Sequence, residues 1–194
     1  MPDIDIDTQS SFNAQTVFKH SVAASMVKNG KLSRHPVGTY FQTIPIDAET
    51  SLAAIPYEEA EDLGYFKVDF LHLTFLDNFT SKQEIRRMLK REPKWMMLQI
   101  PSIVAQLSHI SNHFDMVYQV KPQSIQELAD ILALIRPGKR YLLKAYIKDR
   151  DLVREELYKR PDEAGAAWFK RSHSIAYAHN IILQMLLIED GKLG

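Results

Sequence analysis

The chain has 194 residues, 45% of them hydrophobic, which is enough for one sizeable domain or two small lobes and excludes a disordered protein. It has no cysteine, which excludes disulfides and thiolate zinc sites and suits a reducing compartment. No apolar run approaches membrane-spanning length, and the acidic start differs from the basic start of a signal peptide. We therefore expect a soluble, cytoplasmic protein with no membrane partner.

The net charge is zero, but the charges are unevenly distributed along the chain. Residues 1–80 contain five Lys and Arg against eleven Asp and Glu, whereas residues 81–194 contain nineteen against thirteen. An acidic first part and a basic second part would suit a protein with both a metal site and a phosphate-binding surface.

The first predicted element is a strand in the acidic segment Met1–Asp7. Alternate side chains of a strand share a face, so the aspartates would lie on one face and the isoleucines would point into a core. Carboxylates on one face repel one another unless a divalent cation lies among them, and Mg²⁺ prefers such oxygen ligands. The alternative is a solvated acidic tail. The residues concerned are Asp3, Asp5 and Asp7 on one face, and Ile4 and Ile6 on the other.

Between residues 10 and 44 the pattern predicts a helix, a loop and a strand. Ser10–Lys28 has apolar residues at roughly helical spacing, and Asn29-Gly30 ends this predicted helix. A loop with Arg34 and His35 then leads into a predicted strand over Val37–Ile44. For His35, an ordinary loop histidine is an equally good interpretation.

A second alternating segment, Phe66–Phe70, places Lys67 and Asp69 on one face and its apolar residues on the other. If this strand is the neighbour of the first, Asp69 joins Asp5 and Asp7. Such a group of carboxylates can hold two Mg²⁺ ions, or Mn²⁺ in their place, for phosphoryl transfer. These three aspartates are therefore the candidate metal ligands and catalytic residues.

After residue 80 the pattern is helical. Ser81 and Glu84 form a capping box, which predicts the start of a basic helix. Its basic side chains are either a solvated face or a surface that follows a nucleic-acid backbone. The predicted helices cover Ser81–Arg91, Pro101–Phe114, Ser124–Ile135 and a last segment from Ser172 or Ser174 to about Glu189.

Two histidines, His109 and His113, lie four residues apart in the second of these predicted helices. That spacing allows both to hold one zinc ion. No third ligand is placed to complete such a site, so we interpret them as surface or packed histidines and assign no zinc.

The two alternating segments resemble the catalytic strands of the C-family replicative polymerases, the bacterial DNA polymerase III α subunits. Pro2–Asp7 looks like the catalytic signature of that family. Gly64–Leu73 resembles the second catalytic strand, which reads Gly-Leu-Val-Lys-Phe-Asp-Phe-Leu-Gly-Leu in the family. Asp5, Asp7 and Asp69 stand at the acidic positions, and Lys67 stands at the Lys position.

Three further segments resemble the family and follow its order. Leu32–Gly38 is similar to Gly-Lys-His-Ala-Gly-Gly, although Pro36 departs from that pattern. Ile131–Gly138 is similar to Ala-Leu-Tyr-Arg-Pro-Gly, and Phe169–Ala178 to Phe-Asn-Lys-Ser-His-Ser-Ala-Ala-Tyr-Ala. The alternative for the last two is an ordinary helix end and helix start. The resemblance implies that phosphate is bound by Lys67, Arg34, His35, Arg136, Arg171 and His173.

From the resemblance we expect an α+β fold. A small β-sheet palm of about three strands, of the polymerase-β-like nucleotidyltransferase type, would span residues 1–80, and a helical fingers-like lobe would span residues 81–194. The expected function is metal-dependent nucleotidyl or phosphoryl transfer by a protein that resembles DNA polymerase III α and binds nucleoside triphosphate and DNA. Its compactness would suit a phage-encoded protein in the host cytoplasm.

Several parts of the full-sized family are missing here. The chain has no room for the thumb, and it lacks the Gly-Ser element that precedes the catalytic signature and binds phosphates in the family. Another polypeptide could supply these elements. Two alternatives stay open: a phage enzyme that uses the same site on a nucleotide or a modified DNA base, and a non-catalytic relative that binds DNA or replication proteins.

Overall fold

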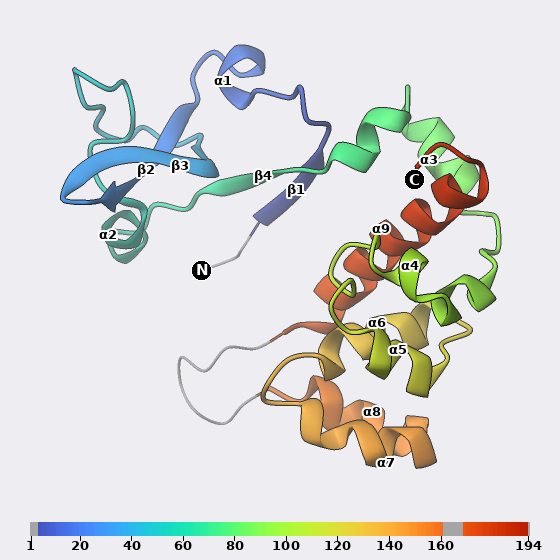
Figure 1. Ribbon diagram of the computed structural model, residues 1–194. Coiled ribbons are helices and arrows are strands. Elements are labelled where there is room, and N and C mark those ends of the chain that lie inside the picture. The colour runs from blue at the N-terminus through green and yellow to red at the C-terminus, as the bar shows by residue number, and fades with distance from the viewer. Residues whose placement is uncertain (1–3, 161–168, 194) are drawn as a thin grey trace. The chain divides into compact units, whose positions relative to one another are not determined.

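The computed structural model describes residues 4–160 and 169–193, so Asp3 lies outside the described residues. The chain divides into two compact units, Met1–Asn78 and Phe79–Gly194, close to the boundary expected after residue 80. We call them the N-terminal and C-terminal units and describe each by itself. The described residues combine a small mixed sheet with helices, which confirms the α+β class (Figure 1).

The described part of the N-terminal unit forms a sheet of four strands, one more than expected, in the order β1-β4-β3-β2. β1 pairs in parallel with β4, and the other two pairs are antiparallel. Both predicted alternating segments are strands, because alternation lets one face pack while the other stays polar. The strands are β1 (Ile4–Thr8), β2 (Val22–Lys28), β3 (Lys31–Tyr40) and β4 (Val68–His72).

A β-hairpin replaces the helix predicted over Ser10–Lys28, so that prediction is wrong. Only α1 (Ala14–Val17) is helical there, and β2 follows it. Asn29 and Gly30 have φ angles of 54° and 72° and join β2 to β3 by a two-residue turn. Asn-Gly favours this turn because both central positions need positive φ. β3 then starts at Lys31, earlier than the strand predicted from Val37.

Two small cores lie on opposite sides of the sheet, with α1 on one side and α2 (Tyr57–Asp62) on the other (Figure 1). On the α1 side Val68 and Phe70 pack with Ala14, and Ile4 joins them. Ile6 is 43% exposed, so the expectation that both isoleucines of β1 enter a core is wrong for Ile6. The α2 side is built from Ala24, Tyr40, Ile44, Ala53 and Ala60. A 3₁₀ turn, η1 (Thr74–Asn78), ends the unit.

The C-terminal unit is helical in its described part. α6 and α9 pack against each other and supply most of its buried residues. Besides α6 (Ile125–Leu134) and α9 (Arg171–Glu189), the helices are α3 (Lys82–Met88), α4 (Pro101–Val104), α5 (Phe114–Val120), α7 (Leu143–Lys148) and α8 (Arg150–Tyr158), with 3₁₀ turns η2 (Trp95–Gln99) and η3 (Arg140–Leu142).

Three of the predicted helices are present. Ser81 caps α3 and Ser124 caps α6, each with a hydroxyl that accepts a backbone N–H bond of 3.2 Å. The last predicted helix is α9, which begins at Arg171. The continuous helix predicted over Pro101–Phe114 is wrong, since α4 ends at Val104 and turns follow it. No helix in the described ranges is long and apolar enough to cross a membrane.

Candidate functional site

The acidic residues of β1 and β4 share one face of the sheet. In the parallel pairing of these strands Asp5 stands directly opposite Asp69, and Asp7 stands opposite Leu71. Because alternate residues of a strand point to the same face, Asp5, Asp7 and Asp69 lie on the face away from Phe70. This is the neighbour relation that the alternating patterns required.

Asp69 is mostly buried and only partly satisfied. Its Oδ2 atom lies 2.6 Å from the ammonium of Lys67, and the two side chains are 15% and 21% exposed. Its Oδ1 atom is buried and has no hydrogen-bond partner among the described residues. A buried carboxylate oxygen without a donor is costly unless a cation or another group completes it. Lys67, which the resemblance assigns to phosphate, is here the counter-charge of Asp69.

His35 adjoins this pair through the backbone of β3. Gly38, which stands opposite Asp69 in the sheet, donates its N–H to Nδ1 of His35 at 2.8 Å. The imidazole packs edge-on against Tyr57 at 5.0 Å between ring centroids. Burial lowers the pKa of His35, and the charge of Lys67 lowers it further. Since Nδ1 accepts a bond, the neutral ring carries its proton on Nε2 and can donate from there.

A polar pocket of about 350 Å³ lies in the same unit, between the segment that follows β1 and strand β3. Arg34 and His35, both predicted, line it, and Arg34 donates to the side chain of Gln15 on α1. His72 at the end of β4 also lines it, and its Nδ1 lies 3.3 Å from the hydroxyl of Thr8. The pocket thus offers a guanidinium, two imidazoles and hydroxyl groups, which are groups that bind phosphate.

His72 was not singled out from the sequence. It lies two residues beyond the alternating segment Phe66–Phe70, and continuation of that alternation was the available signal. The pocket opens on the Phe70 side of the sheet, and among the described residues its lining does not include Asp5, Asp7 or Asp69. The carboxylates and the pocket are therefore two separate features of one unit.

In the C-terminal unit, Arg136 and His173 lie beside one group of stacked rings. The guanidinium of Arg136 lies over the ring of Phe169, 4.1 Å from its centroid. Phe169 stacks with Tyr177 at 6.0 Å, and the ring of His173 lies 6.5 Å from that of Tyr177. The imidazole of His109 also stacks on Tyr177, with 4.2 Å between the ring centroids. The contact with Phe169 holds the Arg136 guanidinium in place.

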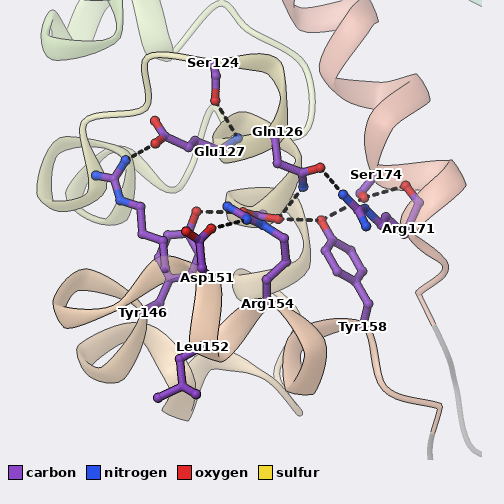
Figure 2. Close-up of polar contacts among 12 residues, drawn as sticks. Ser124, Gln126, Glu127, Tyr146, Asp151, Leu152, Arg154, Tyr158, Arg171 and Ser174 are labelled. Carbon is purple, nitrogen blue, oxygen red and sulfur yellow. Dashed lines mark hydrogen bonds and ion pairs between the residues drawn. The ribbon is translucent and has the colours of Figure 1, made fainter.

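Arg171 is held by a chain of polar contacts that runs through Gln126 (Figure 2) and ends on the buried carboxylate of Asp130. Its guanidinium donates to Gln126, whose amide in turn donates to Asp130 at 2.8 Å. Asp130 is fully buried on α6. It also accepts bonds from Tyr146 and Arg154 at 2.7 and 2.9 Å and from Tyr158 at 3.0 Å. Burial raises the pKa of both tyrosines, and the charge of Asp130 adds to the effect.

The predicted residues form two sets, one in each unit. Asp5, Asp7, Asp69, Lys67, Arg34 and His35 belong to the N-terminal unit, and Arg136, Arg171 and His173 to the C-terminal unit. Within the described ranges, no three Asp, Glu or His side chains are already gathered as a metal-ligand cluster. No protein-family model matches the chain, and a comparison with curated proteins gave no significant match.

Proposed function

We propose that this chain is a compact, metal-dependent nucleotidyltransferase related to the C-family polymerases. The observation that carries the proposal is the pairing of Asp5 with Asp69 across adjacent parallel strands, with one Asp69 oxygen buried and unpartnered. Two carboxylates that share a face repel each other, and a cation bound between them would relieve this repulsion, with the unpartnered Asp69 oxygen as one of its ligands.

The donor set fits Mg²⁺, with Mn²⁺ as a substitute, because carboxylate oxygens are the ligands that these hard cations prefer. Asp5, Asp7 and Asp69 would hold the metal, two ions in the full arrangement. When bound, the metal supplies activation of the attacking hydroxyl and neutralises charge that develops on the phosphate. Lys67 holds one oxygen of Asp69 and so orients this carboxylate for its role.

The proposed substrates are a nucleoside triphosphate and DNA. In the N-terminal unit, Arg34, His35 and His72 line a pocket that suits a phosphate group. In the C-terminal unit, Arg136 is fixed on Phe169, and Arg171 is fixed on Gln126. A fixed guanidinium loses less freedom when it binds phosphate oxygens than a mobile one does.

One observation favours a second candidate, a non-catalytic relative that binds DNA or replication proteins. The Lys67 ammonium lies 2.6 Å from Asp69 and can act as a built-in cation in place of a metal. In that case the carboxylates would be a remnant, and the fold would not respond to divalent ions.

Thermal melting with and without Mg²⁺ separates the two candidates. Under the proposed function, Mg²⁺ raises the melting midpoint of the parent protein because it binds the folded carboxylate site and not the unfolded chain. Asp5→Asn and Asp69→Asn should each abolish this rise. Glu49→Gln removes a charge from an exposed position of the same unit and should retain it. A parent protein that melts at the same temperature with and without Mg²⁺ would favour the non-catalytic candidate.

A further inference from the structure

A second pocket, of about 450 Å³, lies wholly within the C-terminal unit, beside the start of α5, η3 and the start of α7. Its lining contains none of the residues assigned above to metal, nucleotide or DNA. The lining combines one cation, several hydrogen-bonding groups and an apolar wall. It consists of Ser111, Asn112, His113, Phe114, Asp115, Met116, Gln119, Arg140 and Leu143.

The cationic side of this pocket is built from Arg140 and His113. A terminal nitrogen of the guanidinium, Nη2, lies 3.5 Å from Nδ1 of His113. Burial and the charge of Arg140 both lower the pKa of His113, which favours the neutral imidazole beside the guanidinium. In the described part of the chain Arg140 forms no ion pair, whereas Arg91 and Arg150 each have a carboxylate partner. Arg140 therefore keeps most of its donors for a ligand.

The remaining lining decides what kind of anion fits. Phe114, Met116 and Leu143 form an apolar wall, which suits an organic group more than a free inorganic ion. The hydroxyl of Ser111 adds a donor to those of Arg140 and His113. A phosphomonoester has three terminal oxygens, so each of the three groups can donate to an oxygen of its own, whereas on a carboxylate two of them must share one oxygen.

We propose that this pocket binds a phosphomonoester with an apolar or aromatic body, whose phosphate is held by Arg140. The site is separate from the proposed transfer site and needs no metal. The Asp115 carboxylate also lines the pocket, repels the phosphate and limits the affinity.

Calorimetric titration with phenyl phosphate, in the presence of a chelator, tests the proposal. Phenyl phosphate should bind more tightly than inorganic phosphate, because the ring contacts the apolar wall, and more tightly than benzoate. Arg140→Gln should weaken binding about tenfold, which is the loss expected for one charge-assisted contact. Arg87→Gln removes an equal charge from an exposed position on α3 of the same unit and should leave the affinity unchanged.

A gain of affinity provides the second variant. Asp115→Asn should tighten phenyl phosphate binding, and misfolding cannot produce such a gain. Amide chemical shifts should change at Ser111–Gln119 and around Arg140 when the ligand is added. Absence of binding, equal binding by Arg140→Gln and the parent, or shift changes confined to other residues would each overturn the proposal.

Discussion

The buried Asp130 and the mostly buried Asp69 have very different surroundings. Asp130 accepts bonds from Gln126, Tyr146, Arg154 and Tyr158, so its charge is fully compensated inside the protein. The Oδ2 atom of Asp69 pairs with Lys67, whereas its Oδ1 atom has no hydrogen-bond partner among the described residues. The satisfied carboxylate of Asp130 joins helices, whereas the half-satisfied carboxylate of Asp69 is the one for which we propose a cation.

Lys67→Met tests this account of Asp69. Without the ammonium, Asp69 is a mostly buried carboxylate with no counter-charge, so the free energy of unfolding should fall by about 1–3 kcal/mol in a chelating buffer. Mg²⁺ should restore more stability to this variant than it adds to the parent, since metal and lysine neutralise the same carboxylate. Urea unfolding with and without Mg²⁺ measures both effects. An identical Mg²⁺ response in variant and parent would show that lysine and metal do not share Asp69.

Gly38→Ala tests the close packing around the same residue. An added Cβ atom would lie 2.8 Å from Nδ1 of His35 and 3.0 Å from Cδ of Lys67, so both side chains must move. We expect a loss of about 1–3 kcal/mol in the free energy of unfolding, as for other overpacked sites. Gly138→Ala is the matched control, because nothing lies within 4 Å of its added Cβ atom. Equal stability of the two variants in urea unfolding would contradict the packing described here.

At the scale of elements, local signals predicted what depends on neighbours in sequence. The alternating segments gave β1 and β4, and the serine caps gave the starts of α3 and α6. The helix predicted over residues 10–28 was wrong because the apolar residues there fit a helical spacing only roughly. The Asn29-Gly30 dipeptide, interpreted as a helix stop, is itself a strong hairpin signal.

The candidate site was predictable in the same uneven way. Alternation and the family motifs together predicted that Asp5 lies beside Asp69, because both residues stand in strands, where alternate side chains share a face. His72 and Gln15 line or support the pocket through contacts between segments far apart in the chain, which spacing alone does not reveal. Asp130 did leave a signal, since a charge inside the apolar run of a predicted helix must find partners.

Asp130→Asn tests the network that joins α6 to α7 and α8. The variant keeps the shape of the side chain but removes the buried charge that Arg154 and both tyrosines contact. We expect a loss of about 3 kcal/mol or more in the free energy of unfolding, as for other broken buried pairs. Asp151→Asn removes the other carboxylate that contacts Arg154, but Asp151 is 90% exposed and its loss should cost less than about 1 kcal/mol.

Urea unfolding of both variants provides the comparison. Similar losses for Asp130→Asn and Asp151→Asn would contradict the assignment of Asp130 as the centre of the network. The network also includes Arg171, because Arg171 donates to Gln126 and Gln126 donates to Asp130.

At the scale of the whole molecule, the two units carry different chemistry. The N-terminal unit holds the candidate metal-binding carboxylates in a sheet, whereas the C-terminal unit is helical and basic. The candidate metal ligands therefore belong to the N-terminal unit, and most of the arginines belong to the C-terminal unit. The pocket at Arg140 was not predicted from the sequence, because its lining comes from separate segments, residues 111–119, Arg140 and Leu143, that no motif connects.

The most direct test of the central claim is addition of a single nucleotide to a DNA primer by the purified protein. One addition needs the metal site and a bound triphosphate, but it does not need the thumb contacts that favour long products. We predict slow, Mg²⁺-dependent addition that Asp69→Asn abolishes and Glu49→Gln preserves. Absence of any addition with Mg²⁺ or Mn²⁺, or addition that survives Asp69→Asn, would contradict the claim that Asp5 and Asp69 form a nucleotidyl-transfer site.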